Sequence, residues 1–153
     1  MSTASALLDS NVIIAAVART HQHHAPSAAL FAASETRQFA VAAHSYAEAL
    51  VTLTRRGAGG AFQWPAEEAW SVLQSVVAET TLLALTPGQT LDTVRSYAEA
   101  GNIGPRLYDC LIGEVAVLYA IPAIVTWNLR HMTSLFPELR VQTPAQFTGE
   151  VPD

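Results

Sequence analysis

The feature that most constrains the fold is an apolar run near the N-terminus that one acidic residue interrupts. Ala6, Leu7 and Leu8 are apolar, Asp9 follows directly, and apolar residues resume at helical spacing from Val12. A short, fully apolar run of this kind predicts a buried strand of a parallel sheet, followed by a helix. Such a strand delivers its last residue to the carboxyl edge of the sheet, where ligand sites form in α/β proteins. The sequence therefore predicts that Asp9 lies in a functional site.

Short apolar runs alternate with longer amphipathic segments along the rest of the chain. The short runs predict strands over residues 5–8, 39–43, 81–85, 123–126 and, at an edge of the sheet, 139–142. The longer segments predict helices over residues 11–18, 26 to about 34, 45 to about 56, 65 onward, 87 to about 100 and 106–120, with a loop or short helix over 127–135. Strands that alternate with helices favour a parallel sheet covered on both faces. The predicted fold class is therefore α/β.

Local patterns indicate how several helices begin and pack. Asn11 or Ser10 can cap the helix that follows the first strand. Thr86 opens a capping box with proline at the first helical position. In the helix over 106–120, Gly113 belongs to a line of mostly small residues, which allows a neighbouring segment to approach closely.

Length and composition exclude several classes of protein. The chain has 153 residues, half of them apolar, which suits one domain with a sizeable core. Asp and Glu total 13 against 8 basic residues, so the net charge of −5 argues against non-specific nucleic-acid binding over the whole surface. The chain has neither a membrane-spanning apolar run of about 18 residues nor a clear secretion signal. With a single cysteine, these features predict a cytoplasmic protein that does not bind membranes.

Three later polar residues are expected at the same sheet edge as Asp9. Glu48 lies in the helix that directly follows the second strand, and Asp109 lies in the first turn of the helix over 106–120. Asn128 follows the fourth strand closely. Three carboxylates and an amide in one place would repel one another without a cation, and hard oxygen ligands select Mg²⁺ or Mn²⁺. A carboxylate-held Mg²⁺ is a usual arrangement for phosphodiester cleavage.

Each of these residues also has an ordinary structural interpretation. Ser45 and Glu48 have the spacing of a capping box, in which the glutamate accepts a hydrogen bond from the backbone of the cap residue. Asp9 could cap its helix, Asp109 could favour the helix dipole, and Asn128 could be a turn residue. The site hypothesis therefore depends on all four residues meeting at one edge.

Four segments in order along the chain resemble the PIN-domain family. They are the residues LLDSNV at 7–12, SYAE at 45–48, YDCLI at 108–112 and TWNLRH at 126–131. The loop over 20–24 and the stretch over 50–56 are similar to the VapC-type PIN toxins in particular. The resemblance implies a PIN-like three-layer α/β/α sandwich with a mainly parallel central sheet of about four or five strands. It also implies a single domain over residues 1–147, with a C-terminal tail over 148–153.

The resemblance further implies a metal-dependent endoribonuclease toxin that cleaves RNA phosphodiester bonds by metal-activated water. Its partners would be the RNA substrate, a cognate VapB-type antitoxin that inhibits it, and a second copy in a homodimer. Its cofactor would be Mg²⁺ or Mn²⁺.

The family's roles carry over to positions of this sequence that match its motifs. Asp9, Glu48 and Asp109 match the acidic metal-site residues, and Glu48 could instead act as a base through water. Asn128 falls at the fourth acidic or polar position of the catalytic group, although it carries no charge. Thr126 matches a hydroxyl position that could bind substrate.

Arg130 is expected to contact the RNA backbone, and Arg19 could do the same or simply be solvated. His131 lies where many members carry an acid.

Two other functions remain open from the sequence. A phosphoaspartate-type phosphatase would require an acid two residues after Asp9, where this chain has Asn11. A catalytically weak or inactive PIN-fold binding module is compatible with the neutral Asn128.

Several residues that could suggest other chemistry are expected to be structural. Cys110 has no evident basic partner, so we expect an inert buried thiol. Trp64 and Trp70 are expected in the core, and the histidines at 21, 23 and 24 in a solvated loop.

Overall fold

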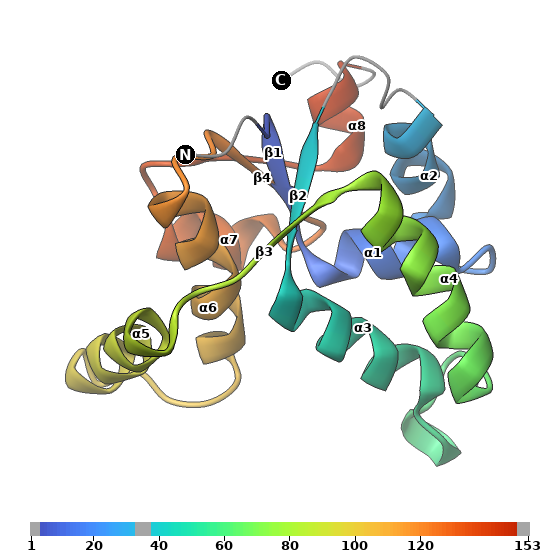
Figure 1. The fold of residues 1–153 in the computed structure, drawn as a ribbon, viewed down its shortest axis with the longest axis horizontal. Coiled ribbons are helices and arrows are strands. Elements are labelled where there is room, and N and C mark those ends of the chain that lie inside the picture. Colours follow the sequence, from blue (N-terminus) through green and yellow to red (C-terminus); the bar gives the residue numbers. More distant parts are fainter. Residues whose placement is uncertain (1–3, 33–37, 150–153) are drawn as a thin grey trace.

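The computed structural model describes residues 4–32 and 38–149, in which five parallel strands form one central sheet (Figure 1). The strand order is β3-β2-β1-β4-β5. The strands are β1 (Ala6–Leu8), β2 (Phe39–Ala42), β3 (Thr81–Leu83), β4 (Ala123–Val125) and β5 (Arg140–Gln142). The strand β1 is central, pairing with β2 on one side and β4 on the other. The predicted α/β class and the edge position of the last strand are confirmed.

Helices connect the strands and cover both faces of the sheet. The first group is α1 (Ser10–Val17), α2 (His24–Ala32), α3 (Ala43–Thr54) and α4 (Ala66–Glu79), with a 3₁₀ turn, η2, at Gly57–Gly59. The second group is α5 (Pro87–Glu99), α6 (Arg106–Leu118), α7 (Leu129–Leu135) and α8 (Pro144–Thr148). The predicted loop or short helix over 127–135 is therefore the helix α7. In the described part of the chain, no helix is both long and apolar enough to span a membrane.

The alternation of side chains along β1 divides the core into two apolar layers. Ala6 and Leu8 face a cluster that includes residues of α1, α2, α3 and α4. Leu7 faces a second cluster, built mainly from α6 and α7 with residues of β2 and β4. These layers lie on opposite sides of the sheet because successive strand side chains point to opposite faces. The result is the expected three-layer α/β/α sandwich, with α5 packed outside α6 (Figure 1).

The small residues of α6 allow a close contact, as the sequence predicts. Gly113 is buried, and a Cβ atom built on it would lie 2.0 Å from the ring of Phe136. Only glycine leaves room for that ring, so the residue fixes how α6 packs against the segment after α7.

Two predicted helix caps are wrong. The first helix is capped by Asp9, whose side chain accepts a hydrogen bond from the Ser10 N–H, and not by Ser10 or Asn11. The helix α3 begins at Ala43, directly after β2, with Ala42 as a cap that makes no side-chain hydrogen bond. Ser45 therefore lies inside the helix, and the predicted capping box with Glu48 does not form.

The remaining differences concern one aromatic side chain, one missed helix and the end of another helix. Trp64 packs against the core, but Trp70 is 46% exposed because the buried face of α4 runs through Ala69, Leu73 and Val76. The sequence analysis missed α8, which begins with a capping box at Thr143. The predicted end of the second helix near residue 34 lies outside the described residues, as do positions 150–153 of the predicted tail.

Candidate metal-binding site at the carboxyl edge of the sheet

The parallel strands bring most of the predicted site residues to one edge of the sheet. Asp9 follows β1 directly, and Thr126 follows β4, the neighbour of β1. Glu48 lies in α3, which starts at the carboxyl end of β2. Asp109 lies in the first turn of α6. The negative charges of Asp9 and Asp109 both act on Glu48, so these three carboxylates share one electrostatic environment.

Asp9 is buried and held by hydrogen bonds from two elements. Its residue is only 2% exposed. Its carboxylate accepts hydrogen bonds from the Ser10 N–H at 2.7 Å and from the Thr126 hydroxyl at 2.8 Å. Its backbone N–H donates to the Val125 carbonyl at 3.0 Å. The Asp9 side chain therefore both caps α1 and belongs to the candidate site.

Asn11 links Asp9 to the loop after β4, a role that sequence reasoning missed. Its amide donates to Asp9 Oδ2 at 3.4 Å and to Thr126 Oγ1 at 3.2 Å. Its carbonyl oxygen accepts a hydrogen bond from the Trp127 N–H at 3.0 Å. Asn11 thus occupies the position where a phosphoaspartate enzyme would need an acid, and it ties two strand ends together instead. The sequence signal for this role was the position of Asn11, two residues after Asp9.

Burial and mutual repulsion raise the pKa values of the three carboxyl groups. Burial raises the pKa of Asp9 to about 6; the hydrogen bond from Thr126 lowers it, and the charge of Asp109 raises it. Burial, together with the charges of Asp9 and Asp109, raises the pKa of Glu48 to about 7, although a hydrogen bond with the Ser10 side chain lowers it. Burial also raises the pKa of Asp109, against the opposing positive charges of His131 and Arg106. The protein therefore disfavours the ionised forms of all three carboxyl groups.

Glu48 has an unsatisfied oxygen close to a histidine that the sequence analysis did not single out. Among the described residues, neither Glu48 Oε1 nor His44 Nε2 has a hydrogen-bond partner, and both atoms are buried. The two atoms are 3.9 Å apart on successive turns of α3. Burial lowers the pKa of His44. The i, i+4 spacing of the two residues was the sequence signal for this pair.

Asn128 occupies an outer position in the site. Its backbone N–H donates to Thr126 Oγ1 at 2.9 Å, and its side-chain amide lies 2.8 Å from His131 Nδ1. The structure thus connects Asn128 to Asp9 through the Thr126 hydroxyl. Arg130 and Arg19 are both exposed.

The donor set fits a hard divalent cation. The carboxyl groups of Asp9, Glu48 and Asp109 offer oxygen ligands, and burial raises the pKa of all three, so a bound cation would favour their ionised forms. Glu48 Oε1, which accepts no hydrogen bond from the described residues, is one of these oxygens. Among residues 4–32 and 38–149, however, no three His, Cys, Asp or Glu side chains converge closely enough to hold a metal ion as they stand. Metal binding therefore requires side-chain movement within the cluster.

An open hollow of about 650 Å³ adjoins the cluster, and Asn11 is one of its lining residues. His21 and Phe62 line it as well, with their rings parallel within 10° and 6.3 Å apart. Nearby, the ring of His23 stacks on Trp127 at 3.9 Å. The histidine loop is therefore anchored by aromatic contacts, and the prediction of a simply solvated loop is wrong.

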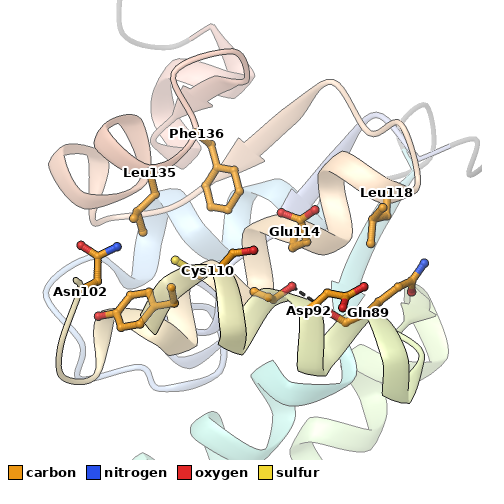
Figure 2. A pocket seen from close by; sticks show the side chains of 11 residues that line it. Gln89, Asp92, Asn102, Cys110, Glu114, Leu118, Leu135 and Phe136 are labelled. Carbon is orange, nitrogen blue, oxygen red and sulfur yellow. Dashed lines mark hydrogen bonds between the residues drawn. The ribbon is translucent and has the colours of Figure 1, made fainter. Parts of the chain in front are cut away.

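A second cavity, of about 390 Å³, lies between α5, α6 and α7 and is a weaker candidate for chemistry (Figure 2). Cys110 and Glu114 line it from α6, and none of the predicted catalytic residues does. Burial and the charge of Asp109 raise the pKa of the Cys110 thiol, which makes it a poor nucleophile. Cys110 is half-buried, less than the sequence suggested, and the opposing charge of Arg106 does not offset the rise in its pKa.

Comparisons with known proteins agree with this geometry. The model of the PIN domain family matches residues 6–131. A search of curated proteins gave no match. The fold is similar to that of VapC20 from Mycobacterium tuberculosis, described as a sarcin-ricin loop cleaving toxin. The TM-score is 0.67 and the identity 14%, covering 89% of this chain and 99% of that one.

Two complexes bound to DNA have similar folds. VapBC2 from Rickettsia felis, bound to a promoter fragment, gives a TM-score of 0.62 at 15% identity, covering 90% of this chain and 97% of that chain. FitAB, bound to a DNA fragment, gives 0.56 at 18% identity, covering 91% and 94%. At these identities the solved structures establish a shared fold. The family model spans most of the sequence, and this chain therefore belongs to the PIN-domain family.

Proposed function

We propose that this chain is a divalent-metal-dependent endoribonuclease of the VapC type. The observation that carries the proposal is the meeting of Asp9, Glu48 and Asp109 at the carboxyl edge of a PIN fold, where their charges act on one another. RNA as the substrate is supported by the similar fold of VapC20, which is described as cleaving the sarcin-ricin loop. Asn11 in place of an acid argues against the phosphatase alternative.

In this proposal, Asp9, Glu48 and Asp109 hold Mg²⁺ or Mn²⁺. Such a cation, when bound, neutralises charge on the scissile phosphate and makes bound water more acidic. Ser10 and Thr126 fix the Asp9 carboxylate through hydrogen bonds, so its orientation is set before substrate arrives. Glu48 Oε1 has no hydrogen-bond partner in the described residues and can accept a proton.

The surroundings of the cluster offer contacts for RNA. The Arg106 charge acts at Asp109, and Arg130 is exposed on α7, the helix that follows Thr126 and Asn128. Both guanidinium groups can bind phosphate. The hollow beside Asn11 is lined by two aromatic rings, a surface on which an unpaired base can stack. We therefore expect a single-stranded or looped RNA substrate.

An antitoxin partner is supported by the two similar complexes and by exposed apolar side chains. Leu91 and Val94 of α5 and Val117 and Leu118 of α6 are exposed. We propose that a VapB-type antitoxin covers apolar surface of this kind and places a basic residue near the carboxylates. A homodimer, a cytoplasmic location and a single domain over residues 1–147 remain part of the proposal.

The test is cleavage of a structured RNA pool by the antitoxin-free protein, with Mg²⁺, with Mn²⁺ or with EDTA. Asp9→Asn and Asp109→Asn variants are run beside the wild type. We expect metal-dependent cuts at defined positions that are lost in both variants. Identical products from the folded wild type and both variants would contradict the proposal. The neutral Asn128, paired with His131, would then favour a non-catalytic binding module.

A further inference from the structure

The hollow beside Asn11 contains two aromatic rings whose orientations are fixed by the chain itself. The Nδ1 atom of His21 accepts a hydrogen bond from the backbone N–H of His23 at 3.0 Å. The ring of Phe62 packs against the core and meets Trp64 nearly edge-on, with centroids 6.4 Å apart and planes at 70°. The planes of the His21 and Phe62 rings are parallel within 10°. The hollow therefore offers two aromatic faces with one common orientation before a ligand arrives.

The histidine ring of this pair is uncharged at neutral pH. Burial lowers the pKa of His21, and the charges of His23 and His24 lower it further. Because its Nδ1 atom accepts a hydrogen bond, the neutral ring carries its proton on Nε2. No Arg, Lys, Asp or Glu is among the described residues that line the hollow. We therefore expect the ligand of this hollow to be planar and uncharged.

Three polar side chains of the same hollow can contact the edge of such a ligand. They are Thr20, Gln22 and Thr52, none of which makes a side-chain hydrogen bond to another described residue. Their hydroxyl and amide groups supply both donors and acceptors. An unpaired nucleobase is planar and uncharged and has hydrogen-bonding edges. RNA-binding proteins stack such bases on aromatic side chains, histidine included.

Asn11 connects this hollow to the carboxylates. It lines the hollow, and its side-chain amide donates to Asp9 Oδ2 at 3.4 Å and to Thr126 Oγ1 at 3.2 Å. One side chain therefore separates the hollow from the acidic site, and a nucleotide with its phosphate at that site can place its base in the hollow. The volume of about 650 Å³ lies within the range of about 300–1,000 Å³ that is typical of small-ligand sites.

We infer that the hollow is a nucleobase subsite, in which the base next to the scissile phosphate stacks on His21 and Phe62 and is read by Gln22. The inference rests on the ribonuclease function proposed above and goes beyond it by naming residues that determine specificity. A glutamine amide forms two hydrogen bonds with adenine, whereas guanine is usually read by Arg or Lys. Because the described lining contains a glutamine and neither Arg nor Lys, adenine should be preferred at this position.

The experiment measures RNA binding to the full-length protein in EDTA, where the proposed cleavage does not occur. The probe is a hexauridylate in which 2-aminopurine, a fluorescent base that is quenched by stacking, replaces one central uridine. We expect the wild type to quench the probe. Phe62→Leu keeps apolar bulk in the core but removes the aromatic face, so it should lose the quenching. Loss of one stacked ring should weaken binding by about 5- to 150-fold.

Matched variants separate stacking from folding and from base reading. Phe62→Trp restores an aromatic face and should retain the quenching. Trp70→Leu removes a ring that is 46% exposed on α4 and does not line the hollow, so it should bind the probe as the wild type does. Gln22→Ala should retain the quenching but lose the preference for adenine over guanine when unlabelled RNAs compete. Circular dichroism verifies that each variant is folded.

The possible outcomes separate this inference from the proposed function. RNA cleavage by a wild type that leaves the probe unquenched, or quenching that persists in Phe62→Leu, would overturn the subsite and leave metal-dependent cleavage standing. An unchanged base preference in Gln22→Ala would overturn the role of Gln22. If Phe62→Leu bound RNA normally but lost the antitoxin, the hollow would belong to that protein interface and the inference would fail.

Two further outcomes concern the nuclease itself. A wild type that quenches the probe but cleaves no RNA with Mg²⁺ or Mn²⁺ would support the subsite and contradict the nuclease. A wild type that neither quenches the probe nor cleaves RNA would overturn both.

Discussion

Asp9 and Glu48 lie at the same edge of the sheet, yet the protein surrounds them very differently. Asp9 accepts hydrogen bonds from Ser10 and Thr126 and is fixed between two strands. Glu48 projects from a helix, and one of its oxygens has no hydrogen-bond partner in the described residues. The half of the site around Asp9 is thus completed by the chain, whereas the half around Glu48 keeps one oxygen without a hydrogen-bond partner in the described residues. Four predictions test this difference.

The largest effect is expected for Asp9→Asn. The amide keeps a capping oxygen but removes the charge, so we expect metal-dependent RNA cleavage to fall by about 100-fold or more. Without metal at pH 8, the variant should unfold at a higher temperature than the wild type, because removal of the buried charge outweighs the loss of the oxygen that accepts the Thr126 hydrogen bond. Cleavage assays and thermal unfolding in EDTA measure the two effects. If the variant cleaved RNA at the normal rate, the negative charge of Asp9 would not be essential.

The next effect is a dependence of stability on pH in the metal-free protein. The folded-state pKa of Asp9, about 6, and that of Glu48, about 7, both lie above their ordinary values. The stability that these groups contribute is therefore present at low pH and is lost as the pH rises from about 4 to about 7. For Asp9 the shift corresponds to about 3 kcal/mol. Half-buried Glu48 should add less because solvent screens it.

Urea unfolding in EDTA at a series of pH values checks this prediction. Added Mn²⁺ should restore stability above pH 6, and Asp9→Asn should flatten the profile. A stability that rises between pH 4 and 7 without metal would show that the carboxylates are compensated by the protein.

A smaller effect is expected for Thr126→Val, which disturbs the completed half of the site. The hydroxyl donates to Asp9 and accepts from the backbone N–H of Asn128, so its removal leaves buried groups unpaired. We expect a loss of about 1–3 kcal/mol in the free energy of unfolding. Thr126→Ser is the matched control, since it keeps the hydroxyl and should lose less than about 1 kcal/mol. Equal losses in both variants would assign the effect to packing.

The smallest effect is expected for Ser45→Ala, on the Glu48 side. The Ser45 hydroxyl is buried and has no hydrogen-bond partner in the described residues, and alanine is the better helix former. We expect stability to rise by about 0.5–1 kcal/mol in chemical unfolding. The control is Ser27→Ala, because the Ser27 hydroxyl accepts a 2.9 Å hydrogen bond from Trp127 and its loss should destabilise the protein. A destabilised Ser45→Ala would indicate a partner for this hydroxyl.

The fold could be predicted because its signals are local. The three inner strands β1, β2 and β4 are short apolar runs, and the alternation of strands with helices favours parallel order. Thr86 shows how reliable a full capping box is when proline follows it, and the same pattern at Thr143 was present but was not used. The capping box predicted at Ser45 does not form because the start of a helix depends on where the preceding strand ends. The helix α3 begins at Ala43, directly after β2, so Ser45 lies inside the helix.

The site was predictable to the extent that strand ends determine it. Asp9 and Thr126 were located by the ends of apolar runs, and the structure joins them by a hydrogen bond. His44 and Asn11 were missed as participants because their roles depend on side-chain directions across neighbouring elements. Asn128 also required the structure, since its pairing with His131 cannot be read from its position after a strand.

The hydrogen bond from Thr126 to Asp9 also sets the time at which the site can form. The two residues are 117 positions apart in the chain. At about 5–20 residues per second, a ribosome needs roughly 6–25 s to synthesise the segment between them. A nascent chain that ends before β4 already contains Asp9, Glu48 and Asp109, but it cannot lock Asp9 in place. Near-completion of synthesis is therefore the step that converts three separate acids into an ordered site.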